Sequence, residues 1–172
     1  MAFNMAFNKS ARFFKHLFGG AWQVRRRFPA SALKSIESAI RESEKTHTGE
    51  LRFVVEAVLH PYELLGGKTP RARAVEIFAR LNVWDTEQNN GVLIYLLLAD
   101  HDVEIVADRG IHGYVGTQGW EAICHAMETA FRQGRFEEGM LAGIKEISAV
   151  LQKNFPADAS DKNELSNEPL AL

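Results

Sequence analysis

The sequence predicts a three-layer α/β/α sandwich, in which helices cover both faces of a mixed sheet in a Rossmann-like arrangement. Three observations predict this fold class. Helix-like and strand-like segments alternate along the chain, the apolar run from Gly91 to Leu98 has the length of a buried strand, and a short acidic turn at Asp100 and His101 folds the next strand back beside it. With 172 residues and a hydrophobic content of 46%, the chain can enclose the core of one domain.

The first half of this domain is expected to contain a helix, a strand and a second helix. Residues 29–49 have apolar side chains at three- and four-residue intervals and end in a glycine, which is typical of a helix. Residues 50–59 alternate at first and then become mostly apolar, as a strand does. Thr69 and Pro70 open the next helix, because threonine is a good N-cap and proline is tolerated in the first turn.

The second half is expected to contain a hairpin followed by two helices. Residues 91–98 and 102–108 pair antiparallel, since only a short turn separates them. The long helical crossover that precedes residues 91–98 favours parallel pairing with the first strand. A helix then begins at Thr117 and stops at Gly134, and a final helix is marked by Met140, Ile144, Ile147 and Leu151.

Composition divides the chain into three parts. Residues 1–28 form a basic amphipathic arm, residues 29–154 form the α/β domain, and residues 155–172 are polar with little to bury, which predicts a disordered acidic tail. The chain has no acid before Glu37, whereas residues 28–152 contain 12 Lys and Arg against 18 Asp and Glu, a net charge of −6. A domain with that balance is a poor nucleic-acid binder, because phosphate affinity needs a basic face.

The arm has two interpretations that the pattern leaves open. Phe14, Leu17, Phe18 and Trp22 fall on one face at helical spacing, with basic residues off that face. The arm is then either a helix resting on an anionic membrane surface or a helix whose apolar face packs on the domain or on a partner. Two consecutive glycines, residues 19–20, count against one long helix.

The chain is expected in the cytoplasm, with a peripheral position at a membrane if the arm binds lipid. No run reaches the roughly 18 apolar residues of a membrane span, and the start lacks the apolar run of a secretory signal. The one cysteine, Cys124, excludes an internal disulfide and is expected in the core on an apolar helix face.

Residues 89–93, Asn-Asn-Gly-Val-Leu, open a buried strand, and Gly110 follows the next strand. Together with the segment 131–139, Phe-Arg-Gln-Gly-Arg-Phe-Glu-Glu-Gly, this pattern resembles the TPM domain family over roughly residues 31–152. The resemblance implies an α/β/α sandwich. It also implies one of three activities found in that family: acid phosphatase activity, binding of Ca²⁺ or a similar divalent ion, or protein interaction in membrane-protein maintenance. His112 departs from the pattern, where the family usually has Glu.

Oxygen-bearing side chains gather where the outer ends of the hairpin should meet, and hard cations prefer such ligands. The candidate metal ligands, for Ca²⁺ or Mg²⁺, are Asp85, Glu87, Asn89, Asn90, Asp108 and His112. The same residues also suit ordinary turns, because Asn and Asp bond their own backbone there. The opposite end of the hairpin, with Asp100 and Asp102, is expected to be a solvated turn.

No complete catalytic motif accompanies these candidates. The glycines at 110, 113 and 116 follow a strand, but they lack the Gly-x-Gly start of a dinucleotide site, so no nucleotide is expected. The favoured function is a non-catalytic module that binds a protein partner near a membrane surface, with a divalent cation as a further ligand. The alternative is a divalent-metal-dependent acid phosphatase. A third hypothesis is a structural subunit that self-associates through its arm. The oligomeric state is left open.

Overall fold

A computed structural model describes residues 12–158 and 162–172 of the chain, so the first eleven residues of the predicted arm and three residues of the predicted tail lie outside the description. A helical turn covers residues 12–17. The helices that follow are α2 (Ala21–Arg27), α3 (Ala30–Glu44), α4 (Pro61–Leu65), α5 (Pro70–Arg80), α6 (Arg109–Arg132) and α7 (Phe136–Asn154), and the strands are β1 (Leu51–Glu56), β2 (Val92–Leu97), β3 (Asp102–Ala107) and β4 (Leu170–Ala171).

The strands form a mixed sheet in the order β3-β2-β1-β4. β1 and β2 are parallel, with Leu51 opposite Val92, and β2 and β3 are antiparallel, with Val92 opposite Ala107. The helical crossover through α4 and α5 therefore returns the chain parallel to β1, and the tight turn after β2 makes the predicted hairpin. Both pairings agree with the sequence prediction.

The sheet lies between two apolar cores, because every residue of β1 and β2 is buried and successive side chains of a strand point to opposite sides. On one face, Phe53 and Ile94 pack with side chains of α3, α6 and α7, and this core includes Cys124. On the other face, Val54 and Leu93 pack with α5. Burial raises the pKa of the Cys124 thiol to about 12, which agrees with the prediction of a core cysteine.

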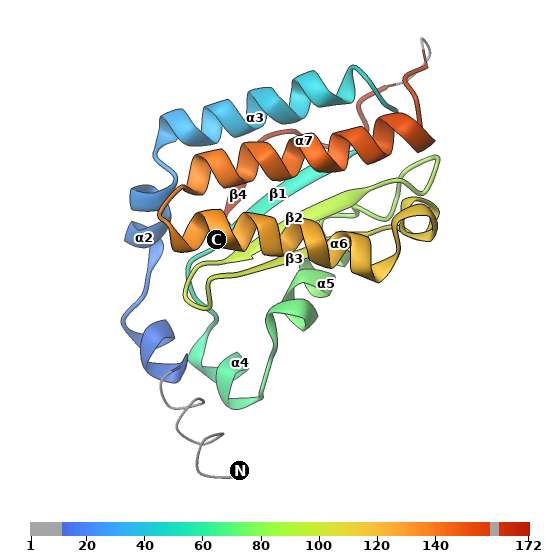
Figure 1. Cartoon of the computed structure of the whole chain (residues 1–172). Coiled ribbons are helices and arrows are strands. Elements are labelled where there is room, and N and C mark those ends of the chain that lie inside the picture. The colour runs from blue at the N-terminus through green and yellow to red at the C-terminus, as the bar shows by residue number, and fades with distance from the viewer. Residues whose placement is uncertain (1–11, 159–161) are drawn as a thin grey trace.

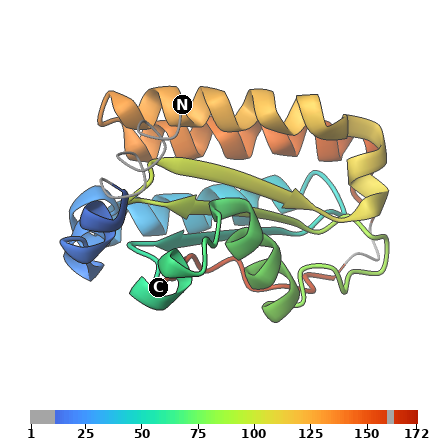
Figure 2. The ribbon, with the colours of Figure 1, turned by 90° about the horizontal axis from the view of Figure 1, so that it is seen from below.

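Figures 1 and 2 show the resulting layers. α6 and α7 lie over one face of the sheet, α3 runs beside α7, and α4 and α5 lie on the opposite face (Figure 2). The arrangement is the predicted three-layer α/β/α sandwich. Within the described residues, no helix combines the length and the apolar character needed to cross a bilayer.

The structure corrects the prediction of a disordered tail for the part of residues 155–172 that it describes. β4 extends the sheet parallel to β1, and the N–H of Leu172 donates to a β1 carbonyl at 2.9 Å. Upstream, the Glu50 carboxylate accepts the backbone N–H groups of Glu164 and Leu165 at 2.9 and 3.1 Å. Composition missed this segment because several of its contacts are made by backbone groups, which every sequence carries.

The segment with the glycines at 110, 113 and 116 is helical, although the sequence predicts a helix only from Thr117. Asp108 caps α6, and its carboxylate accepts the N–H of Arg109 at 2.7 Å. Gly116, with φ of 69° and ψ of 171°, separates this first helical piece from a second one, whose start coincides with the predicted helix start at Thr117. Glycine is a poor helix former, but the cap at Asp108 and contact with the preceding loop outweigh that cost.

Candidate functional site

The loop before β2 and the first turn of α6 lie against each other at the outer end of the hairpin. The N–H of Asp108 donates to the carbonyl of Gly91 at 2.9 Å, and the N–H of Ile111 donates to the carbonyl of Asn89 at 3.3 Å. A Cβ on Gly110 would lie 2.4 Å from that same Asn89 oxygen, so only glycine fits this contact. The hairpin thus brings two segments about 20 residues apart into one corner.

Asn90 is buried in this corner and connects the corner to the segment that precedes β1. Its side-chain amide donates to the Thr48 carbonyl at 3.0 Å and to the Thr48 hydroxyl at 3.2 Å, and its backbone N–H donates to the Thr86 hydroxyl at 3.0 Å. Its side-chain oxygen, Oδ1, is buried and has no hydrogen-bond partner among the described residues.

Asp108 presents a second buried acceptor. Oδ1 of its carboxylate accepts from Arg109, whereas Oδ2 is buried and has no partner within the part of the chain that the structure describes. Buried oxygens without donors are costly unless water or an ion meets them. The corner therefore suits a ligand that brings positive charge or hydrogen-bond donors, such as a hydrated divalent cation.

The other candidate ligands are exposed or make contacts elsewhere. Asp85 and Glu87 are exposed, and the N–H of Glu87 instead faces the Glu164 carboxylate of the tail at 3.3 Å. Asn89 adopts a positive φ of 54°, and its side-chain oxygen accepts from the Arg109 side chain at 3.4 Å. These contacts agree with the turn interpretation of the loop.

His112 faces a different part of the surface. It lines a cavity of about 300 Å³ together with Arg71, Glu104 and Trp120, and no residue of the loop before β2 lines that cavity. In the described residues, no group of three His, Cys, Asp or Glu side chains is placed to hold a metal ion. Of the candidate ligands, only Asn90 and Asp108 have a buried side-chain oxygen without a partner among the described residues, and they belong to the two segments that meet at this corner.

The opposite end of the hairpin is not a simple solvated turn, because the arm binds there. Both oxygens of Asp100 accept hydrogen bonds from the Arg12 side chain, at 2.9 and 3.1 Å, and Nε2 of His16 lies 3.1 Å from Asp100 Oδ1. His16 is buried, and its Nδ1 accepts the N–H of Leu59 at 2.8 Å. Burial opposes ionisation of Asp100, but the hydrogen bonds from His16 and Arg12 outweigh it and lower the pKa.

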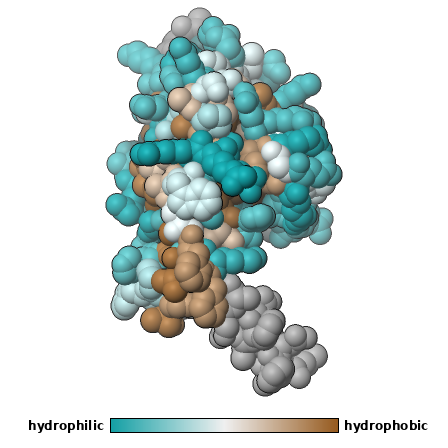
Figure 3. All heavy atoms as spheres, turned by 90° about the vertical axis from the view of Figure 1, so that its left-hand side faces the viewer, coloured by the Kyte–Doolittle hydropathy of each residue, from teal (hydrophilic) through white to brown (hydrophobic). Residues whose placement is uncertain are grey.

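These polar contacts hold the arm so that its aromatic residues point outward. The side chains of Phe14, Leu17, Phe18 and Trp22, here called the aromatic face of the arm, are 56%, 51%, 75% and 56% exposed. Figure 3 looks onto this side of the molecule, where brown apolar side chains gather below a band of teal hydrophilic ones. The interpretation in which the apolar face packs on the domain is therefore wrong, because His16, Val24 and Phe28 are the buried residues of this segment.

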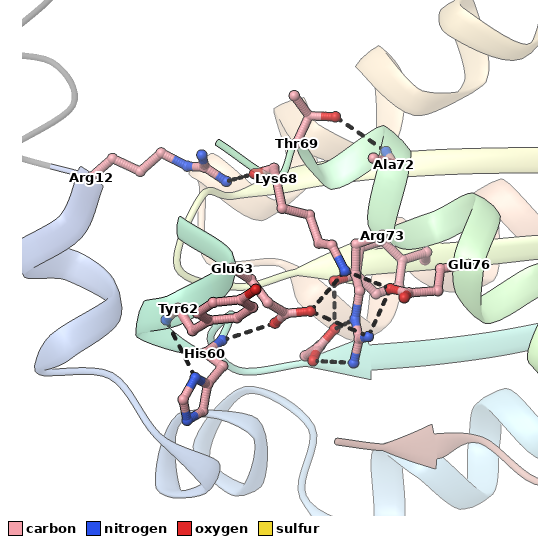
Figure 4. A network of polar contacts seen from close by, with 11 residues as sticks. Arg12, His60, Tyr62, Glu63, Lys68, Thr69, Ala72, Arg73 and Glu76 are labelled. Carbon is pink, nitrogen blue, oxygen red and sulfur yellow. Dashed lines mark hydrogen bonds and ion pairs between the residues drawn. The ribbon is translucent and has the colours of Figure 1, made fainter. Parts of the chain in front are cut away.

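A buried ion-pair network near the end of β1 was not predicted. Arg73 donates to both oxygens of Glu56 at 2.9 Å, and the Tyr95 hydroxyl donates to Glu56 at 2.7 Å. Around them, Lys68 bridges Glu63 and Glu76 at 2.9 and 2.8 Å (Figure 4). One signal existed in the sequence: a glutamate inside an apolar strand needs a partner. Because all these charges are paired, we interpret the network as one that stabilises the fold.

The comparisons with known proteins agree with the motifs. Residues 27–150 match the family described as TPM domain. The NMR structure of BA42 from the psychrophilic bacterium Bizionia argentinensis is similar, with 32% identity over 84% of this chain and 95% of that chain and a TM-score of 0.74. The N-terminal domain of a protein from P. gingivalis, 20% identical, shares the fold over 73% of this chain and 77% of that chain, with a TM-score of 0.59. No curated protein sequence matches the chain.

Proposed function

The chain belongs to the TPM domain family, and from that premise we propose that it is a non-catalytic protein-interaction module that rests on an anionic membrane surface through its N-terminal arm. The observation that carries this proposal is the way in which the arm contacts the domain. Its polar side chains, Arg12 and His16, bind the domain, and its aromatic face is left in water. A monomer gains nothing from exposing four large apolar side chains together, and such patches mark interaction surfaces.

The surroundings of this face favour a membrane as the surface it meets. Arg25, Arg26 and Arg27 are exposed beside it in α2, and Tyr62 and Leu65 of α4 are 80% and 78% exposed. Aromatic residues with flanking bases are typical of segments that lie in the interface of an anionic bilayer. In this orientation the acidic α/β domain faces away from the lipid and is available to bind a protein partner.

Flotation with vesicles tests the arm. Leu17→Ser combined with Phe18→Ser should reduce partition onto vesicles that contain phosphatidylglycerol by about 30-fold, because each half-buried apolar side chain contributes about 1 kcal/mol. Trp84→Ser is the matched control, since Trp84 is 50% exposed and precedes β2 at the other end of the hairpin. Equal partition of the double variant and the control would refute the membrane role of the arm.

A divalent cation at the corner of Asn90 and Asp108 is the second element of the proposal. The two unpartnered oxygens support it, and Mg²⁺ in particular is held by few protein ligands while it keeps its waters. Titration with Ca²⁺ and with Mg²⁺ should shift the amide resonances of residues 88–91 and 108–111 together. Asp108→Asn should weaken the response, whereas Asp85→Asn, in the exposed part of the loop, should not; equal responses would refute this location.

The alternative function, a divalent-metal-dependent acid phosphatase, would use the same ion with its bound water as the nucleophile. It predicts hydrolysis of a phosphomonoester that a chelator abolishes and that Asp108→Asn reduces. Activity that survives both treatments would exclude this corner as the catalytic site, and no activity at acid or neutral pH would leave the binding module as the function.

A further inference from the structure

A cavity of about 320 Å³ lies where the arm, α2 and the tip of the hairpin meet. Three of its lining residues are cations, namely Lys15, Arg26 and Arg27, and none of its lining residues is an acid. The adjacent acid of the hairpin turn, Asp100, does not line the cavity and is already bound by the arm. The three cations have no ion pair with any carboxylate in the described residues, so their charge is available to a ligand.

Two further observations show that positive charge is concentrated and fixed at this place. The guanidinium of Arg27 lies over the Phe136 ring, 4.8 Å from its centroid, which restrains the position of that cation. His101, which also lines the cavity, has a lowered pKa because it is partly buried and because Lys15, Arg27 and Arg132 repel its proton. The fields of several cations therefore overlap at the hairpin tip.

The rim of the cavity is apolar as well as basic. Phe18 and Trp22, two members of the aromatic face of the arm, line it together with the three cations. A ligand that fills this place must carry negative charge on a group that fits between guanidinium and ammonium side chains, and apolar mass beside that group. Phosphate fits the first condition, because Arg and Lys donate several charge-assisted hydrogen bonds to its oxygens.

We propose that this basic cavity binds the phosphate of an anionic phospholipid headgroup, with the acyl chains beside the aromatic face of the arm. The proposal rests on the membrane role proposed above and adds a ligand and a site to it. It gives the arm a preference for anionic lipid that its aromatic residues alone would not have.

The test uses the full chain and two kinds of vesicle, one of phosphatidylcholine alone and one that also contains phosphatidylglycerol. Lys15→Gln combined with Arg26→Gln should lower partition onto the anionic vesicles by about 30-fold, because each basic residue near an anionic surface contributes about a factor of five. The weak partition of this double variant onto vesicles of phosphatidylcholine alone should equal that of the wild type. Lys145→Gln combined with Lys153→Gln removes the same charge from exposed positions of α7 and should have little effect.

The outcomes separate the two proposals. If wild-type protein floats but the cavity variant keeps the wild-type preference for phosphatidylglycerol, or if the α7 variant loses the preference equally, the cavity is not the headgroup site. If wild-type protein floats with neither vesicle, the membrane role itself fails. A titration with inorganic phosphate tests the remaining possibility. Saturable amide shifts at Lys15, Arg26 and His101, without a preference of the protein for anionic vesicles, would refute the lipid headgroup as ligand and indicate free phosphate instead. Equal urea midpoints for all variants confirm that they fold.

Discussion

Asp102→Asn should stabilise the domain at neutral and alkaline pH. Asp102 begins β3 as a partly buried carboxyl, and its Oδ1 has no hydrogen-bond partner in the described part of the chain. Burial raises its pKa from 3.8 to about 6, and the negative charges of Glu104, Glu128 and Asp100 contribute to the rise. Asparagine has the same shape without the charge, so the substitution removes the cost of ionising this side chain in the folded protein.

The direction of this pH dependence follows from the number of protons that the folded and unfolded states bind. A carboxyl with a raised pKa holds more protons in the folded state than in the unfolded state between pH 3.8 and about 6, so the free energy of unfolding falls as the pH rises through that window. The full difference corresponds to about 3 kcal/mol. Because the carboxyl is partly in contact with water, screening should reduce this to about 1 to 2 kcal/mol. The gain from Asp102→Asn should reach this size above about pH 6, fall to a small fraction of it at about pH 4 and vanish below the unfolded-state pKa of 3.8.

Urea unfolding of the wild type and the variant, at about pH 4 and about pH 8, measures the effect directly. Glu146→Gln is the matched control, because it removes one negative charge from an exposed position of α7. A gain at alkaline pH that is specific to Asp102 supports the argument. Equal unfolding free energies for wild type and Asp102→Asn at both pH values, or an equal gain from Glu146→Gln, would refute it.

Three other changes have clear expected outcomes. Arg73→Ala removes the partner of a buried glutamate at the end of β1, so urea unfolding should show a loss of about 3 kcal/mol or more; a loss below about 1 kcal/mol would mean that water reaches that carboxylate. Gly110→Ala places a Cβ 2.4 Å from a backbone oxygen and should lower Tm strongly, whereas Gly113→Ala in the same helix meets nothing within 4 Å and should not; similar Tm values would contradict the close contact. Deleting residues 162–172 should accelerate amide exchange of Ala57, which donates to the tail, and unchanged exchange would argue against β4.

The sequence predicted the sheet well because its strands carry strong local signals. The apolar run at 91–98 and the turn after it could form only a buried strand and a hairpin, and Thr69 with Pro70 marked the start of α5 where the structure has it. Elements with weak local signals were missed. α4 is only five residues long, and β4 is two residues whose pairing depends on a strand more than 100 positions away.

The candidate site was predicted in part for a similar reason. Hairpin geometry predicted that the loop before β2 meets the start of α6, because antiparallel pairing determines which strand ends lie together. The direction of His112 could not be predicted, since it depends on where α6 begins, and the glycines of that segment concealed the helix. The contact between Arg12 and Asp100 spans 88 positions and has no local pattern at all.

The anchoring of the arm by His16 also determines where the proton of that imidazole sits. Since Nδ1 accepts the N–H of Leu59, the proton of the neutral ring must be on Nε2, from which it is donated to Asp100. A docked arm therefore holds a single tautomer, whereas a detached arm leaves the ring free to exchange between two. In 15N-labelled protein, the nitrogen chemical shifts of this one histidine consequently report the docked fraction of the arm in solution, without any substitution in the aromatic face of the arm.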